Sequence, residues 1–205
     1  MFNIDKVLDD ENTSIEDKAE LSIKYLLRSR ENKKRGLALS ILDGLNMAKG
    51  KFICVADVDG QHNIFDAFQL YKISKQENLM VIGSRFKRGG GMGSSSHFVF
   101  SFAFNIWLIF LTRVSCLDKT GGFFVIPQQL YRSKIKKISN IIFSGYGDYF
   151  INLIRFMHKK KIKFVEEPVF YRLRSSGYSK SNFSKMIISY TLTAIKSVWI
   201  KELNS

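Results

Sequence analysis

Two carboxylates stand one residue apart at the end of an apolar run, in the segment VADVDGQHN. Asp57 and Asp59 follow a predicted strand, and such a pair can bind one hard divalent cation together with the oxygens of a diphosphate. A simpler interpretation is that Asp59 forms a turn and Asn63 caps the next helix. Gln61 and His62 either complete a ligand shell or lie on the loop surface. Taken alone, the motif favours the turn.

Two clusters of basic residues are candidates for phosphate binding. RLRSSGYSK at residues 172–180 combines two arginines, a glycine, a serine and a lysine, and GSRFKRGGG places Arg85 after another predicted strand. Arginine binds phosphate through paired hydrogen bonds, and lysine adds a point charge. A solvated basic surface is the alternative for each cluster by itself.

The net charge of +14 indicates an anionic partner: nucleic acid, a phosphorylated small molecule or an acidic membrane surface. Nucleic acid is disfavoured, because the aromatic residues gather in apolar runs instead of alternating with Lys and Arg. Cys54 and Cys116 have neither disulfide-framework nor zinc spacing, and no signal peptide is evident. These features predict a protein of the reducing cytoplasm.

Strands and helices alternate through the first 85 residues, which is typical of a doubly wound α/β domain. We expect strands at 5–10, 51–57 and 79–86, and helices at 14–27, 36–50 and 63–76. Ligands of such sheets bind at the carboxyl ends of the strands, where Asp57, Asp59 and Arg85 emerge. A glycine-rich loop or lid follows at 87–96, and a further strand is expected at 162–174.

Two apolar segments remain. The aromatic segment at 98–111 is shorter than the roughly 20 residues of a membrane-spanning helix, so it is a core helix or lies in a membrane surface. The tail is predicted to be a helix with apolar residues around most of its circumference. Its polar stripe consists of Lys185, Ser189, Thr193 and Ser197.

At 205 residues the chain can build one sizeable core. We predict an α/β domain over residues 1–182 that includes an amphipathic interfacial segment at 97–114. A C-terminal amphipathic helix is expected at 183–205.

The order of these segments resembles the dolichol-phosphate (polyprenyl-phosphate) mannosyltransferase group of family 2 glycosyltransferases. DVDGQH is followed by GSRFKRGGG, an aromatic segment, KTGGFFVIP, GYGDYF and EEPVFYRLRSSGYSK. The resemblance covers Val7 to Lys185 and implies a GT-A fold, with a mostly parallel sheet flanked by helices. It also implies inverting transfer of a sugar to polyprenyl or dolichyl phosphate at the cytosolic membrane face. GDP-mannose is the group's commonest donor, and UDP-glucose or another sugar nucleotide is the alternative.

The resemblance assigns a donor site to several carboxylates. Asp57 and Asp59, with Gln61, would hold Mg²⁺ or Mn²⁺ against the donor diphosphate. Asp9 and Asp10, in VLDDEN, would lie near the nucleoside.

It also implies that phosphate groups contact Arg85, Arg172, Arg174, Ser179 and Lys180. Thr120 and Gly121 would line the sugar side, and Asp148 would contact a sugar hydroxyl. Asp59, Arg85 and Asp148 are the expected catalytic residues. The expected partners are the nucleotide sugar, the lipid phosphate, the membrane surface and a small membrane subunit.

The acceptor chemistry predicts a mechanism without a general base. A phosphate monoester has a second pKa of about 6, so at neutral pH it is already a nucleophile. The family's first strand and its P-x-Y-N-E loop have no counterpart before VLDD. An inactive GT-A binding module is therefore the competing hypothesis.

Overall fold

The structure, a computed structural model, describes residues 36–57, 59–173 and 183–200. The strand expected at 5–10 and the helix expected at 14–27 lie outside the described residues. The elements named below all lie within the described residues.

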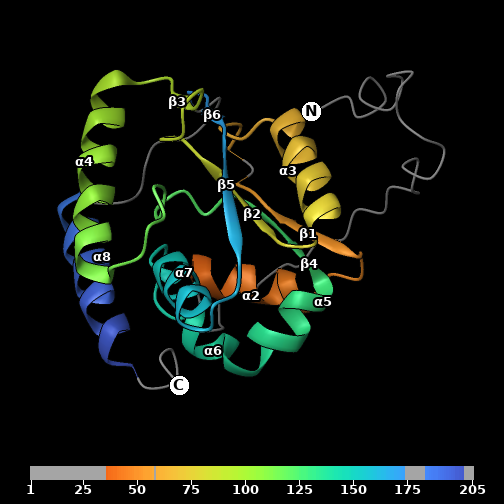
Figure 1. Cartoon of the computed structure of the whole chain (residues 1–205). Coiled ribbons are helices and arrows are strands. Elements are labelled where there is room, and N and C mark those ends of the chain that lie inside the picture. The colour runs from red at the N-terminus through yellow and green to blue at the C-terminus, as the bar shows by residue number, and fades with distance from the viewer. Residues whose placement is uncertain (1–35, 58, 174–182, 201–205) are drawn as a thin grey trace, which may run out of the picture. The chain divides into compact units, whose positions relative to one another are not determined.

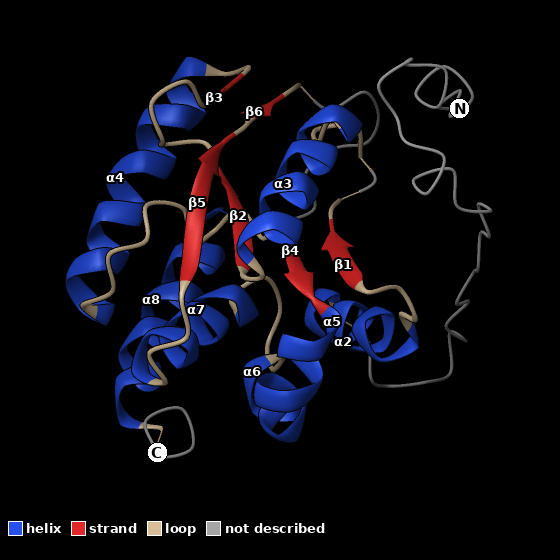
Figure 2. Ribbon diagram, turned by 45° about the vertical axis from the view of Figure 1, so that its right-hand side comes forward, coloured by secondary structure: helices blue, strands red, loops and turns tan. Residues whose placement is uncertain are grey.

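A four-stranded sheet with the order β1-β4-β2-β5 forms the centre of these residues (Figure 2). Its strands are β1 (Phe52–Val55), β2 (Met80–Ser84), β4 (Phe124–Pro127) and β5 (Phe164–Pro168). β2 pairs in parallel with β5, whereas β4 runs antiparallel to β1 and β2. The sheet is therefore mixed, which corrects the expectation of a mostly parallel sheet. The chain returns to the edge where β1 and β2 end before it enters β4, so β4 has to run the opposite way.

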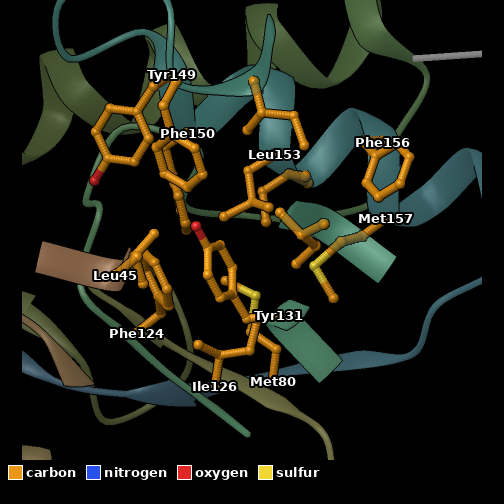
Figure 3. Close-up of a cluster of buried hydrophobic side chains, with 14 of the residues drawn as sticks. Leu45, Met80, Phe124, Ile126, Tyr131, Tyr149, Phe150, Leu153, Phe156 and Met157 are labelled. Atoms are coloured by element: carbon orange, nitrogen blue, oxygen red, sulfur yellow. The ribbon is translucent and has the colours of Figure 1, made fainter. Parts of the chain in front are cut away.

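Helices cover both faces of this sheet. α3 (Ile64–Glu77) packs on one face, and α2 (Leu37–Met47) and α7 (Tyr149–Lys159) on the other. Side chains of a strand alternate between the two faces, so Val81 packs near α3, while Met80 and Ile82 join the α2–α7 side. Figure 3 shows the core on that side, where α7 side chains meet those of the sheet.

Short helical segments connect β4 to α7: α5 (Gln128–Leu130), a π turn η2 (Tyr131–Ile135), a 3₁₀ turn η3 (Lys136–Ile138) and α6 (Ser139–Ile142). Tyr131 and Ile135 of these turns are buried in the same core.

Several expected elements are confirmed, with changes in detail. Asn63 caps α3, since its side-chain oxygen accepts a hydrogen bond from the Phe65 N–H at 3.1 Å. β2 is buried along its whole length. β1 was expected to be equally buried, but Ile53 is its one buried residue, because among the described strands β1 pairs with β4 alone.

The glycine-rich segment is more ordered than a free loop. It contains β3 (Gly91–Met92), which pairs in parallel with β6 (Phe170–Tyr171). The strand expected at 162–174 is therefore divided at Val169 into β5 and β6. Gly90 has to be glycine, because a Cβ there would lie 2.6 Å from the Ser84 carbonyl oxygen.

α4 (Ser95–Thr112) and α8 (Phe183–Trp199) pack side by side (Figure 1). α4 buries Leu108 together with the polar side chains of Asn105 and Thr112, and it leaves many of its large apolar side chains exposed. Together the two helices expose a set of large apolar side chains, which we call the α4–α8 face. It consists of Val99, Phe100, Phe102, Ile106, Trp107, Phe110, Ile188, Leu192, Ile195 and Trp199.

The polar stripe predicted for the tail helix is divided between two environments. Lys185 and Ser189 are exposed, whereas Ser197 is buried and Thr193 bonds to Asp148.

Of the described helices, α4 is long and apolar enough to cross a membrane, with 18 residues and a mean hydropathy of 1.4.

Candidate active site

The candidate site lies at one edge of the sheet. β1 ends at Val55 and β2 at Ser84, and β4 begins beside them, because Phe124 is paired with both Val55 and Ile82. The segments after β1, after β2 and before β4 therefore meet at this edge. This arrangement brings the predicted residues Asp57, Asp59, Arg85, Thr120 and Gly121 to one end of the sheet.

The loop that carries the two aspartates is held by its own hydrogen bonds. The Gln61 N–H donates to Asp59 Oδ1 at 3.1 Å, and the Asp57 N–H donates to His62 Nδ1 at 2.9 Å. The Gln61 side chain donates to the Arg172 carbonyl at 3.4 Å, and the Arg172 N–H donates to the Gln61 carbonyl at 3.0 Å. The turn interpretation is therefore confirmed for Asp59, and metal binding by the two carboxylates stays a prediction.

His62 is the structural support of this loop. Its ring stacks on Phe123 at a centroid distance of 4.4 Å and meets Tyr171 edge-on at 4.6 Å. Burial lowers the pKa of His62 to about 4, although Asp59 acts in the opposite direction. The imidazole is therefore neutral at physiological pH, with Nδ1 engaged by the Asp57 backbone.

The depressed pKa of His62 predicts a pH dependence of stability. The unfolded chain takes up this proton near pH 6.5 and the folded chain near pH 4, so the contribution of His62 is complete above pH 6.5 and is lost towards pH 4. His62→Asn keeps an acceptor for the Asp57 N–H and does not titrate. Between pH 7 and 4 in metal-free buffer, we expect the wild type to lose about 2 kcal/mol more unfolding free energy than His62→Asn. Equal losses in urea titrations of the two proteins would contradict this.

Arg85 forms a buried ion pair with Asp118. Its Nε and Nη2 donate to the two Asp118 carboxylate oxygens at 2.8 and 2.7 Å, and its backbone N–H donates to Oδ2 at 3.0 Å. Nη2 also donates to the Thr120 hydroxyl at 2.8 Å. Burial opposes ionisation of the guanidinium, but the Asp118 carboxylate outweighs it and raises the pKa of Arg85. In this geometry Arg85 organises the segment before β4, and its contact with phosphate stays a prediction.

The segment around Asp118 is fixed from two sides. Glu166 of β5 accepts the backbone N–H groups of Leu117 and Asp118 at 2.8 and 2.9 Å. Asn105 of α4 accepts the Lys119 N–H at 2.7 Å and donates to the Thr120 hydroxyl at 3.0 Å. α4 thereby contributes directly to the site.

Lys119 is fully buried, and its side chain bonds to the turn after α4. Its ammonium donates to the carbonyls of Val114 and Cys116 at 2.8 and 2.6 Å. Burial lowers the pKa of Lys119 to about 8. Lys119 therefore secures the turn after α4.

Three tyrosine hydroxyls lie close to glycines of the motifs KTGGFF and GYGDYF. A Cβ on Gly121 would lie 2.7 Å from the Tyr171 hydroxyl, and one on Gly122 would lie 2.8 Å from the Tyr149 hydroxyl. A Cβ on Gly147 would likewise clash with the hydroxyl of Tyr190, which belongs to α8. These contacts require glycine in KTGGFF and GYGDYF, and they bring α8 to the same edge.

Asp148 connects α8 to the loop before α7. The residue is 5% exposed, and its carboxylate accepts hydrogen bonds from the Tyr146 N–H at 2.7 Å and the Thr193 hydroxyl at 2.5 Å. Contact with a sugar hydroxyl stays a prediction for this residue.

Of the basic cluster at residues 172–180, the structure describes only residues 172 and 173. Arg172 is exposed and lies next to the aspartate loop through its backbone bonds to Gln61. The other predicted residues lie outside the described part of the chain: Asp9, Asp10, Arg174, Ser179 and Lys180.

Sequence reasoning missed the residues that organise the site: Asn105, Asp118, Glu166, Tyr171 and Tyr190. One signal was available for Asp118. An arginine at the end of a fully buried strand needs a buried carboxylate nearby, and Asp118 precedes the next strand of the sheet.

Metal binding by the aspartate loop stays a prediction, and its few ligands set a condition on it. Asp57 is exposed and Asp59 is half-buried, and carboxylate oxygens are the ligands that Mg²⁺ and Mn²⁺ prefer. Among residues 36–57, 59–173 and 183–200, no group of three or more His, Cys, Asp or Glu could hold a metal. A cation bound by Asp57 and Asp59 would therefore need further oxygen ligands from outside the described residues, such as those of a bound diphosphate.

Comparison with known proteins gives the class of this chain. Residues 9–137, more than half of the chain, match the family described as Glycosyl transferase family 2. The chain belongs to this family, and its class of reaction is the transfer of a sugar. The match contains the aspartate loop, Arg85 and Thr120, and ends before Asp148 and α8. A search of curated proteins finds no match.

Proposed function

We propose that the chain transfers a sugar, mannose from GDP-mannose in the first instance, to the phosphate of a polyprenyl or dolichyl lipid at the cytosolic face of a membrane. The supporting observation is the position of the exposed α4–α8 face on the two helices that also contact the site. Such a face suits an enzyme that has to reach an acceptor embedded in a bilayer.

The contacts with the site are direct. Asn105 of α4 bonds to Thr120, and Thr193 of α8 bonds to Asp148. Helices that dock in the membrane interface would therefore hold the site at the height of the lipid phosphate. Lysines near these helices would meet anionic headgroups.

The site also suits an acceptor that needs no general base. The backbone N–H of Asp57 donates to Nδ1 of His62, and burial lowers the pKa of this imidazole to about 4. His62 is therefore a poor proton acceptor at neutral pH. A lipid phosphate is already ionised and requires only alignment with the anomeric carbon. A bound Mg²⁺ or Mn²⁺ would supply charge stabilisation to the departing diphosphate. The residues of the chain hold the aspartate loop and the segment before β4 in place.

An acceptor series tests this proposal. The full chain is incubated with labelled GDP-mannose, Mn²⁺ and one of three acceptors: polyprenyl phosphate, the polyprenol without phosphate, or a soluble sugar. Of the three acceptors, we expect only polyprenyl phosphate to give a product. Product with the alcohol or the soluble sugar would overturn the assignment of the acceptor.

The α4–α8 face makes a separate prediction about membrane binding. Trp107→Ser combined with Phe110→Ser removes two large exposed side chains without changing charge. Since burial of each is worth roughly 2 kcal/mol, binding to phosphatidylcholine vesicles should weaken at least about tenfold. Ile64→Ser with Phe65→Ser removes exposed apolar side chains from α3 and should change vesicle binding less than about twofold.

Vesicle co-sedimentation measures both pairs. Equal weakening by the two pairs would contradict membrane docking through the α4–α8 face. If the wild type does not bind vesicles at all, the result would instead favour the predicted small membrane subunit as the partner of the α4–α8 face.

A further inference from the structure

A cavity of about 810 Å³ lies where α4, α7 and α8 end. Arg113, Arg155 and Lys159 give this cavity a basic side. Its apolar side includes Leu111, Ile195 and Trp199, and the last two belong to the α4–α8 face. The cavity therefore combines positive charge with a continuation of the surface proposed to meet the bilayer.

The electrostatic environment of the cavity is positive. Among the described residues that line it, none is Asp or Glu. Burial lowers the pKa of His158 in the cavity wall, and the positive charges of Arg155 and Lys159 lower it further. The pKa of Arg155 is also lowered, by burial and then by Arg113. The positive side chains are close enough to act on one another and so favour an anionic ligand.

Basic residues at helix ends have a simpler use, which accounts for part of this arrangement. Helix C-termini carry partial negative charge, and Arg155 Nη1 donates to the Thr112 carbonyl at 2.9 Å. That contact explains Arg155, which is 6% exposed. It does not explain why exposed Arg113 and Lys159 line the same cavity as apolar side chains. A ligand with an anionic head and an apolar tail matches both sides.

We propose that this cavity binds the phosphate headgroup of an anionic membrane lipid, with its acyl chains along Ile195 and Trp199. The site is separate from the catalytic edge, because Arg113 lies eight residues beyond Asn105, about 12 Å along the axis of α4. A lipid bound here would fix α4 and α8 relative to the bilayer. The inference rests on the proposed membrane docking and is independent of the sugar donor.

The test removes the two exposed charges without disturbing the fold. Arg113→Asn suits the left-handed backbone of this residue, whose φ is 54°, and Lys159→Gln preserves length and polarity. The matched control is Lys134→Gln with Lys137→Gln, which removes two exposed charges from η2 and η3. The full chains are titrated with vesicles of phosphatidylcholine containing 20 mol % phosphatidylglycerol, and with phosphatidylcholine alone.

We expect the Arg113→Asn and Lys159→Gln pair to weaken binding to the anionic vesicles about tenfold and the control pair less than about threefold. Binding to phosphatidylcholine alone should stay within twofold in both pairs. Inorganic phosphate at 10 mM should not displace the wild type, since it has no apolar tail. Displacement by inorganic phosphate would overturn the lipid assignment.

A second readout locates the contact. The chain has two tryptophans, so Trp107→Phe leaves Trp199 as the single tryptophan, at the cavity. Brominated phosphatidylglycerol should quench Trp199 more strongly than brominated phosphatidylcholine at equal content. Equal quenching, or equal weakening by the two charge pairs, overturns this site and leaves membrane docking intact. Failure of the wild type to bind any vesicle overturns both.

Discussion

Replacement of Asp59 by Asn should reduce the rate of sugar transfer by at least about 100-fold and leave the fold intact. The asparagine oxygen can still accept the Gln61 N–H, so the turn that Asp59 forms is preserved. What is lost is the negative charge proposed to hold Mg²⁺ or Mn²⁺ against the donor diphosphate. Initial rates with saturating donor and acceptor measure the effect.

The comparison with Asp59→Ala separates the two roles of this side chain. Alanine removes the turn bond as well as the charge, so it should lose at least as much activity and up to about 1 kcal/mol of unfolding free energy. The control variant is Glu77→Gln, at the last residue of α3. It also removes one carboxylate and should retain full activity. Activity of Asp59→Asn within threefold of the wild type would contradict the proposed metal site.

The largest effect on stability is expected from Asp118→Asn. Asp118 is fully buried and binds both Nε and Nη2 of Arg85, so its neutralisation leaves a buried guanidinium without its charge partner. Such a loss costs about 3–5 kcal/mol, a large part of the stability of a typical domain. The free energy of unfolding in urea, read by circular dichroism, measures this change.

A double variant tests the physical reason. Asp118→Asn combined with Arg85→Met leaves no charge buried, so it should recover at least half of the stability lost by Asp118→Asn. Glu167→Gln on β5 is the matched control and should change stability by less than about 1 kcal/mol. A cost below 1 kcal/mol for Asp118→Asn would show that the ion pair does not organise this edge of the sheet.

Local signals in the sequence predicted the elements that depend on near neighbours. α3 follows from its Asn63 cap, and β2 from an uninterrupted apolar run. The position of Asp57 and Arg85 at one edge followed from the rule that ligands bind at strand ends. The family resemblance added the expected roles of these residues.

Contacts between distant segments were not predictable in the same way. Arg85 and Asp118 are 33 residues apart, and their pairing requires the antiparallel register of β4 against β2. β4 itself was assigned no direction by its sequence, since an apolar run reads the same in both directions. The mixed sheet and the Arg85–Asp118 pair therefore share one cause.

The pattern on α4 and α8 shows a different limit. Hydrophobic periodicity predicts which residues of a helix are apolar, but it does not predict which of them are buried inside the protein. Asn105 of α4 and Thr193 of α8 point to the site, while Phe110 and Trp199 are 73% and 80% exposed. The exposed apolar side chains of the α4–α8 face are the physical basis for the proposed membrane docking.

The most direct test of sugar transfer uses the full chain, polyprenyl phosphate in phosphatidylcholine vesicles and Mn²⁺. Each labelled sugar nucleotide, GDP-mannose first and UDP-glucose second, is added in turn, and label that partitions into organic solvent is counted. The account predicts lipid-linked label with one donor, lost on addition of EDTA and in Asp59→Asn. Absence of lipid-linked label with every donor, from a folded chain that binds the vesicles, would contradict it and favour an inactive binding module.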